Sequence, residues 1–201
     1  MAFPLRPGVA EGWGHAVLHC PYCHGWEVRD RSIGVLATGP VSVDQAVLWS
    51  QWSDRVTLLT HTRQRPEPAD EARLRVRGVR IAEGQVTGLV TGQDGLEAVE
   101  LADGARVALT ALVVAPRFVP RLGGLGELPI ETAALELFGQ DAGRYVVTNG
   151  QGATNVPGVY AAGNVSSLTE TVIGAAGAGL RVAAAVNLDL INEDIRTAPR
   201  G

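Results

Sequence analysis

The sequence contains no lysine, and all 17 of its basic residues are arginine. This excludes a Schiff-base lysine and a Walker-type phosphate loop, because both need the lysine amine. The 21 acidic residues give a net charge of −4 without a basic stripe, which argues against nucleic acid as a main partner. No stretch approaches 18 uninterrupted apolar residues, and the N-terminus lacks the apolar run of a signal peptide. We therefore expect a cytoplasmic chain, in a reducing compartment, with no membrane partner.

Hydrophobic residues make up 46% of the 201 residues, which is enough to bury a core. Residues 33–37 and 56–60 are short apolar runs that predict buried parallel strands, and residues 41–52 between them predict a helix. Residues 66–76 begin with prolines and predict a polar surface helix. Glycine-punctuated segments over residues 79–115 predict antiparallel strands joined by tight turns.

The last third of the chain has a different sequence pattern. Residues 116–143 are irregular in pattern, with several prolines and glycines, and two further short strands are expected at residues 145–148 and 159–162. A long helix closes the chain. Its alanine-rich part, residues 174–191, is interrupted by polar residues, which favours a buried helix of a soluble protein over a membrane span.

The strand, turn and helix that begin at residue 33 are typical of the front of a dinucleotide-binding unit. Such a turn needs glycines so that backbone N–H groups can approach a pyrophosphate at the helix N-terminus. Here the pattern is reduced to Ala37-x-Gly39-x-x-Ser42, which keeps one glycine of three. An ordinary connection in an α/β fold therefore stays open as an alternative.

The only two cysteines form a single C-x-x-C, the sequence CPYC at residues 20–23. Four interpretations compete. The pair is a redox dithiol, half of a zinc site, a haem attachment site with His24 completing C-x-x-C-H, or two inert cysteines. A zinc site needs a second pair of ligands, and no other cysteine exists. The histidines His15, His19, His24 and His61 show no convincing partner spacing beyond His15/His19. Haem attachment is disfavoured because the sequence has no export signal and no methionine other than Met1 to serve as an axial ligand.

The chemistry of the motif favours the redox dithiol. Two thiols at this spacing can close a disulfide, and a helix N-terminus favours the thiolate of the first one. His24 follows directly and can carry a proton near neutral pH. Its alternative is an exposed helix residue with no role. Gly25 permits close approach by a flat cofactor or by another backbone segment.

Two motifs in the right order resemble one known family. Residues 20–27 (CPYCHGWE), followed by the turn at residues 33–42, resemble the thioredoxin reductase-like class of flavin- and pyridine nucleotide-dependent disulfide oxidoreductases. Residues 157–165 (PGVYAAGNV), followed by the small-residue helix from Gly174, resemble the second flavin motif of that family. The resemblance extends from about residue 8 to residue 195.

The resemblance implies an α/β fold in which an NAD(P)-binding domain is inserted into a split FAD-binding domain. Residues 20–115 would form the Rossmann-like three-layer nucleotide-binding domain, with the C-x-x-C and an antiparallel β segment. Residues 116–201 would form the C-terminal part of the FAD-binding domain, and residues 1–19 a lead-in or partial crossover from it. The cofactors implied are FAD and NADPH or NADH.

The resemblance also implies roles for single residues. Cys23 would face the flavin, Cys20 would attack the substrate disulfide, and His24 stands where the family has an acid/base residue. The turn after the first strand, the end of the second strand and the second flavin motif would hold the two cofactors. The candidate cofactor-binding residues are Thr38, Gly39, Pro40, Val41, Ser42, Thr60, His61, Gly163, Asn164, Val165, Thr171, Val172 and Ile173.

Three departures from the family pattern stand out. The N-terminal FAD-binding strand, glycine loop and helix are absent from the sequence. Where NADPH-specific members carry adjacent arginines, only Arg63 and Arg65 are nearby, so NADH, or neither coenzyme, stays open as an alternative to NADPH. Asn164 stands where many members have aspartate, which still permits a hydrogen bond to a ribitol hydroxyl.

We therefore expect a truncated disulfide oxidoreductase with impaired activity on its own. Electrons would pass from NAD(P)H through FAD to the Cys20–Cys23 disulfide, and then to a thioredoxin-like protein or a small disulfide. An uncovered apolar face would favour homo-oligomers or association with a missing FAD-binding half. The alternatives are a non-flavin redox-sensing or nucleotide-binding module, and a fragment without a function of its own.

Overall fold

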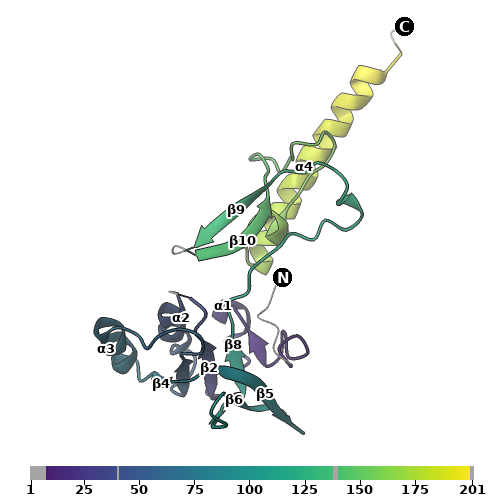
Figure 1. Ribbon diagram of the computed structural model, residues 1–201. Coiled ribbons are helices and arrows are strands. Elements are labelled where there is room, and N and C mark those ends of the chain that lie inside the picture. Colours follow the sequence, from purple (N-terminus) through teal and green to yellow (C-terminus); the bar gives the residue numbers. More distant parts are fainter. Residues whose placement is uncertain (1–7, 40, 138–139, 200–201) are drawn as a thin grey trace. The chain divides into compact units, whose positions relative to one another are not determined.

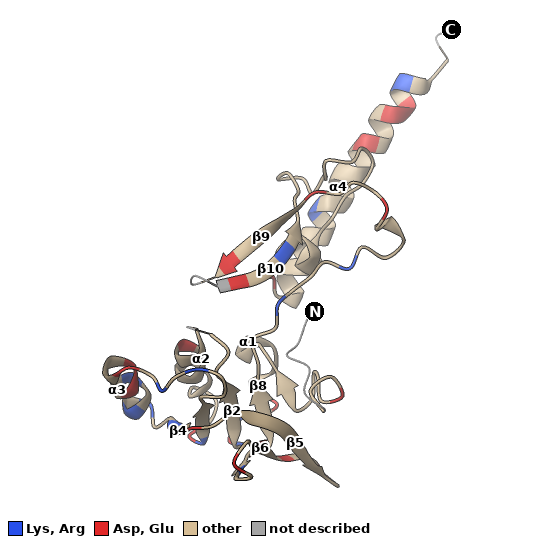
Figure 2. Ribbon diagram, in the orientation of Figure 1, with Lys and Arg blue, Asp and Glu red and all other residues tan. Residues whose placement is uncertain are grey.

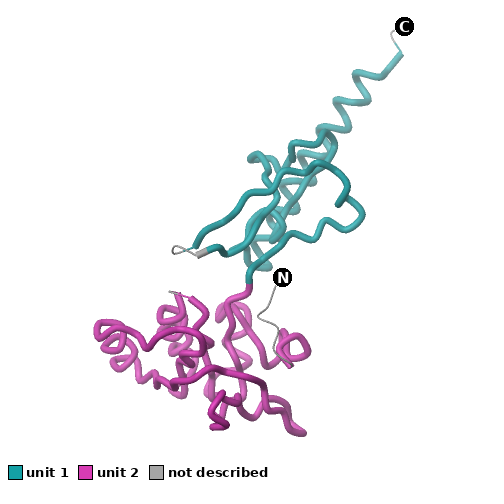
Figure 3. Tube along the Cα trace, viewed as in Figure 1, with its two compact units in different colours: residues 1, 117–137, 141–201 teal, residues 2–116, 138–140 magenta. Residues whose placement is uncertain are grey.

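The computed structural model describes residues 8–39, 41–137 and 140–199 (Figure 1). The chain divides into two compact units, shown in Figure 3. Unit 2 consists of residues 2–116 and 138–140, and unit 1 consists of residues 1, 117–137 and 141–201.

Unit 2 is built on a five-stranded parallel sheet with the order β1-β8-β2-β3-β4. Strand β2 (Ile33–Leu36) is fully buried and pairs with β3 (Val56–Leu59) and with β8 (Ala111–Val113). Strand β1 (Val17–Leu18) pairs with β8 at one edge, and β4 (Arg80–Ala82) pairs with β3 at the other. All these pairings are parallel, so the carboxyl ends of the strands lie along the same edge of the sheet.

One face of the parallel sheet is covered by helices. Helix α2 (Ser42–Trp49) follows β2 and buries Ala46 and Trp49 in a cluster with the side chains of β2, β3 and β8 that point to this face. Helix α3 (Pro68–Val76) contacts α2 and buries one residue, Leu74, in the same cluster. The remaining residues of α3 are polar or exposed, as expected for a surface helix.

The other face is covered by an antiparallel sheet of β5 (Val86–Gly92), β6 (Gly95–Leu101) and β7 (Arg106–Ala108). Apolar residues of β5 and β6 pack against Leu36 and Leu112 of the parallel sheet. Alternate residues of each buried strand therefore enter two different cores, which explains why these strands are apolar throughout. The predicted α/β fold with parallel and antiparallel strands is confirmed.

The direction of two strands was predicted wrongly. Strands β4 and β8 lie within the segment expected to be antiparallel, yet both run parallel to their neighbours. A short apolar run shows that a strand is buried but not which partner it takes, and the partners of β8 lie far away along the chain.

Unit 1 contains a two-stranded sheet of β9 (Thr132–Leu137) and β10 (Gln140–Val146), and the long helix α4 (Val172–Thr197). Strand β9 lies in the segment predicted to be irregular, and the strand predicted at residues 159–162 is only an isolated bridge between Ala153 and Tyr160. Two short 3-10 helices, η1 (Gly123–Leu125) and η2 (Gly163–Val165), complete the unit.

The expectation that the closing helix is buried is also wrong. None of the 26 residues of α4 is buried, and several of its large apolar side chains are exposed. By length and composition alone α4 could cross a membrane, a test that core helices of soluble proteins also pass. Alanine and glycine give a helix a smooth apolar surface, so sequence alone does not show whether another segment covers it.

Candidate functional site

The C-x-x-C of unit 2 lies directly after β1, at the edge where the parallel strands end. Helix α1 (Pro21–His24) begins directly after Cys20, and its single turn brings Cys23 beside Cys20. The Cys23 thiol donates a hydrogen bond to Cys20 Sγ at 2.9 Å, and both cysteines are free thiols. This bond, together with burial and the charge of Cys20, raises the pKa of Cys23 to about 11. Cys23 therefore keeps its proton at neutral pH, while Cys20 is the acceptor.

Two histidines flank the dithiol. His24 ends α1, and His19 precedes Cys20 with its ring stacked on Trp13 at a centroid distance of 5.3 Å. Burial lowers the pKa of His19, and the nearby charge of His24 lowers it further. His19 is therefore a neutral base next to the first thiol. It was considered as a metal ligand from the sequence but not as part of the dithiol site, because only the fold shows its stacking.

Exposed aromatic side chains lie near Cys23 in the sequence. Tyr22 is 75% exposed and Trp26 is 63% exposed, and the Arg29 guanidinium lies 3.8 Å from the centre of the Trp26 ring. Arg29 also donates to the Trp26 carbonyl oxygen. Aromatic side chains that a substrate can contact are therefore exposed within three residues of Cys23.

Gly25 makes close approach possible, as expected, but the neighbour is a side chain of unit 2 itself. A Cβ atom at Gly25 would lie 2.7 Å from ring atoms of Trp52 and 2.4 Å from the Pro21 carbonyl oxygen. The glycine allows α1 to pack on the Trp52 indole, which fixes the position of the dithiol against the rest of the unit.

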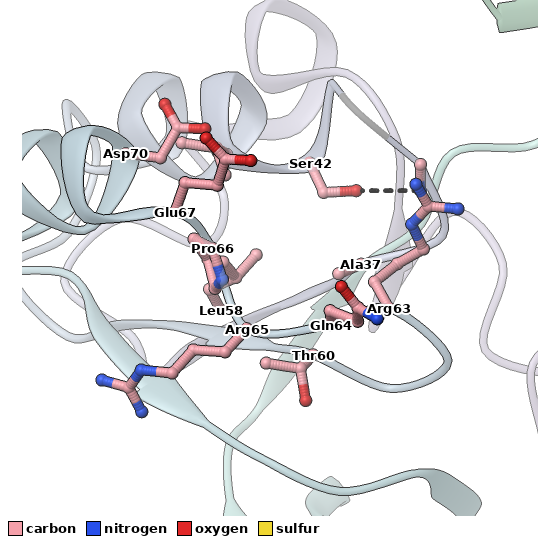
Figure 4. A pocket seen from close by; sticks show the side chains of 12 residues that line it. Ala37, Ser42, Leu58, Thr60, Arg63, Gln64, Arg65, Pro66, Glu67 and Asp70 are labelled. Carbon is pink, nitrogen blue, oxygen red and sulfur yellow. Dashed lines mark hydrogen bonds between the residues drawn. The ribbon is translucent and has the colours of Figure 1, made fainter.

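A pocket of about 300 Å³ opens at the carboxyl ends of β2 and β3 (Figure 4). The Ala37–Ser42 turn forms one side of it. There the Gly39 N–H donates to Ser42 Oγ at 3.3 Å, and Ser42 is buried. The loop after β3 forms the other side. The lining residues are Ala37, Gly39, Ser42, Val43, Leu58, Thr60, Arg63, Gln64, Arg65, Pro66, Glu67 and Asp70.

The predicted coenzyme residues of unit 2 fall into three groups. Gly39, Ser42 and Thr60 line the pocket, whereas Thr38 and Val41, in the same turn, and His61, after β3, do not line it. Pro40 lies outside the described residues.

The side chains of the two residues after β3 accept hydrogen bonds from backbone N–H groups. Thr60 Oγ1 accepts a hydrogen bond from the Gly84 N–H at 3.2 Å. His61 Nδ1 accepts one from the Val86 N–H at 3.1 Å, in a buried position with φ of 52°. These two residues tie the pocket loop to the antiparallel sheet, so they position the loop.

Sequence reasoning did not single out Gln64, Pro66, Glu67 and Asp70, which complete the pocket. The available signal was their place after the second strand of the βαβ unit, where the acidic residue of dinucleotide-binding folds is expected.

In unit 1 the predicted flavin residues lie at the start of α4. Gly163 has φ of 75° and is buried, and a Cβ atom there would lie 3.3 Å from Ala175 Cβ, so η2 packs closely on the helix. Thr171 caps α4 by accepting a hydrogen bond from the Gly174 N–H. Val172 and Ile173 are 86% and 82% exposed. Asn164 is exposed and Val165 is half-buried.

Comparison with known proteins decides the family. A model of the family described as "Pyridine nucleotide-disulphide oxidoreductase" matches residues 2–186. The chain belongs to this family. It is 30% identical to the thioredoxin reductase aclD of Aspergillus oryzae over 80% of this chain and 52% of aclD. It is 25% identical to the thioredoxin reductase sirT of Leptosphaeria maculans over 96% of this chain and 61% of sirT.

A solved structure agrees with this assignment. The crystal structure of HlmI superposes with a TM-score of 0.80 and 42% identity, covering 97% of this chain and 58% of HlmI. The chain is thus a thioredoxin reductase-like pyridine nucleotide-disulphide oxidoreductase that spans about half to three-fifths of the length of these relatives.

The residues present fit the cofactors that the pyridine nucleotide-disulphide oxidoreductase family implies. The pocket at the end of β2 and β3 has the size and place of a dinucleotide site, with Gly39 at its turn. The exposed Val172 and Ile173 offer apolar contacts to a flat ring, and Gly163 allows its backbone to approach a ligand.

Proposed function

We propose that the chain carries the dithiol and pyridine nucleotide-binding parts of a thioredoxin reductase-like flavoenzyme. Electrons pass from NADH or NADPH through FAD to the Cys20–Cys23 disulfide, and then to the disulfide of a thioredoxin-like protein or a small molecule. Residues 20–115 act as the NAD(P)-binding domain and residues 116–201 as the C-terminal part of the FAD-binding domain. The reaction belongs in the cytoplasm, whose reducing conditions suit such chemistry.

The observation that carries this proposal is the contact between the two sulfur atoms. Cys20 and Cys23 are hydrogen-bonded at 2.9 Å on a short helix whose aromatic neighbours are exposed. Thiols held in this way exchange readily between a dithiol and a disulfide, and substrate can reach them.

The dithiol chemistry balances as two linked exchanges. The Cys20 thiolate attacks one sulfur of the substrate disulfide, which forms a mixed disulfide and releases one substrate thiol. Cys23 loses its proton and attacks Cys20, which releases the second substrate thiol and leaves the Cys20–Cys23 disulfide. The substrate has then gained two electrons and two protons, and the dithiol has lost them. FAD, when bound and reduced by NADH or NADPH, would supply the two electrons that restore the dithiol, and the two protons would come from solvent.

The protons move through the two histidines. Cys23 holds its proton tightly, so its attack needs a base, and His24 is the adjacent candidate. His19 is kept neutral by burial, so it can accept the proton of Cys20.

Association is part of the proposal. The exposed apolar side chains of α4 need a partner surface, either a second copy of the chain or a separate FAD-binding half. Activity of the chain alone is therefore impaired, and flavin binds with the associated form.

The test is to purify the chain with FAD and to record its visible absorption after gel filtration. We expect a flavin band that co-elutes with the associated form and bleaches with NADH or NADPH without oxygen. The Cys20→Ser/Cys23→Ser variant should keep the flavin and lose reduction of a small aromatic disulfide. A colourless protein in every fraction would overturn the proposal for this chain.

A flavin-independent redox module is the second candidate. It is favoured by the fact that both cysteines and their histidines lie within unit 2 alone. In that case oxidised glutathione would close the disulfide reversibly in a colourless protein, and neither coenzyme would reduce it.

A further inference from the structure

Acidic groups surround the pocket at the ends of β2 and β3. Four charged side chains line it, and they consist of Arg63 and Arg65 against Glu67 and Asp70. The charges of the lining residues alone therefore cancel. The balance changes when the ion pairs of these residues are included, because each pair brings in a carboxylate from a neighbouring element.

Arg65 is held by two carboxylates outside the pocket lining. Its Nε donates to Glu71 of α3, and its Nη1 donates to Glu83 at 2.5 Å. Arg65 also lowers the pKa of Glu71, so the carboxylate stays charged. In Figure 4 the side chains of Arg63 and Arg65 point in opposite directions. Arg65 is thus committed to two acids, and the pair of acids leaves an excess negative charge beside it.

Arg73 of α3 has the same arrangement. It bridges Asp70 at 2.9 Å and Asp44 of α2, so a second guanidinium is shared between two acids. Figure 2 shows acidic and basic residues on α3 and an acidic residue on α2. The pocket and its ion pairs thus carry five carboxylates and three guanidinium groups. The carboxylates stay in excess even when Arg75, which also acts on Glu71, is counted.

We propose that this pocket prefers NADH to NADPH, and that Glu71 and Glu83 set the preference by holding Arg65. The inference rests on the proposed function, because it requires that the pocket binds a pyridine nucleotide. NADPH differs by a 2′-phosphate of about −1.5 to −2 charges, which arginines accommodate near the end of the second strand. Here Arg63 is the cation of the lining without an ion pair among the described residues, and the carboxylates of the pocket and its ion pairs outnumber the guanidinium groups.

The test measures binding of NADH and NADPH to the full chain by calorimetry, which needs neither FAD nor turnover. We expect NADH to bind at least about tenfold more tightly, since one charge-assisted hydrogen bond is worth roughly that factor. The difference should shrink with added salt, because exposed charges are screened.

Variants identify the residues responsible. Glu71→Gln/Glu83→Gln should improve NADPH binding about tenfold and leave NADH binding unchanged. Adding Arg65→Gln to that variant should remove the gain, whereas Arg65→Gln in the wild type should change NADPH binding little. The matched control Asp54→Asn/Asp94→Asn removes two exposed carboxylates elsewhere in unit 2 and should shift neither coenzyme.

Each outcome has one meaning. A wild-type chain that binds NADPH as tightly as NADH, or an Arg65→Gln variant that loses NADPH selectively, overturns the inference alone. An equal gain from the control pair overturns the role of Glu71 and Glu83. Failure of both coenzymes to bind, with the chain folded by circular dichroism, overturns the proposed function itself.

Discussion

At the residue scale, the Cys20–Cys23 contact predicts how each thiol reacts. Replacing Cys20 by alanine removes the main cause of the raised Cys23 pKa, so that pKa should fall from about 11 toward the ordinary thiol value. We expect alkylation of Cys23 by iodoacetamide at pH 8.5 to become at least about tenfold faster in reduced Cys20→Ala. Fragment-ion mass spectrometry measures the rate at this residue. Equal rates in both proteins would contradict the hydrogen bond.

The same shift gives the sign of a pH effect. A thiol with a raised pKa in the folded state stabilises that state below the pKa of the unfolded thiol. This contribution is lost as the pH rises through about 11. Because Cys23 is exposed, the loss should be small. When the pH is raised from neutral to 10.5, the urea midpoint of the reduced chain should therefore fall slightly more than the midpoint of Cys23→Ser.

Gly25 makes a second prediction at this scale. Alanine there has no room between Trp52 and the Pro21 carbonyl, so Gly25→Ala should destabilise unit 2 by about 1–3 kcal/mol. Urea unfolding followed by tryptophan fluorescence measures this. Gly88→Ala is the matched control, because a Cβ atom at that position would meet no heavy atom within 4 Å. A midpoint that is unchanged in both variants would show that α1 does not depend on this contact.

Single residues also show how far sequence could predict the site. The spacing of Cys20 and Cys23 predicted their contact, because one helical turn joins them. The hydrogen bonds of Thr60 and His61 could not be predicted, since their partners Gly84 and Val86 lie in the loop before β5 and at the start of β5. Both residues hold the loop through these bonds, and Thr60 also lines the pocket, so their coenzyme contacts stay a prediction.

At the element scale, α4 predicts association. Leu180 and Ile191 are 75% and 46% exposed on a helix with no buried residue. We expect the purified chain to self-associate with rising concentration, and Leu180→Glu/Ile191→Glu to reduce this clearly in light scattering. Arg196→Glu, on the polar end of the same helix, is the control. A wild-type chain that stays monomeric at every concentration would contradict the prediction.

The individual helices and strands also show which features of the fold the sequence pattern predicts and which it does not. Strands β2 and β3 and helices α2 and α3 follow one another locally. Apolar runs and helical spacing predicted β2, β3 and α2, and the prolines and polar composition of residues 66–76 predicted α3. The direction of β8 was missed because its partners are β1 and β2, far away in the sequence. The exposure of α4 was missed because composition does not reveal whether a covering segment exists.

At the scale of the whole molecule, the core is unevenly distributed. The buried hydrophobic residues lie almost entirely in unit 2, and Val146 is the one in the described part of unit 1. We expect amide hydrogens of α4 to exchange at least about a hundredfold faster than those of β2, β3 and β8. Addition of NADH should slow exchange at residues 37–43 and 58–67 alone. Hydrogen exchange with mass spectrometry measures both effects, and equal protection in the two units would contradict the first.

The position of β8 between β1 and β2 has a consequence for biosynthesis. Strand β1, which leads into the dithiol, is held in the parallel sheet by β8, and Val113 leaves the ribosome long after Cys20. At roughly 5–20 residues per second, the nascent cysteines stay untethered for several seconds. During that time they can react with other thiols, so a newly made chain depends on the reducing power of its surroundings until its sheet closes.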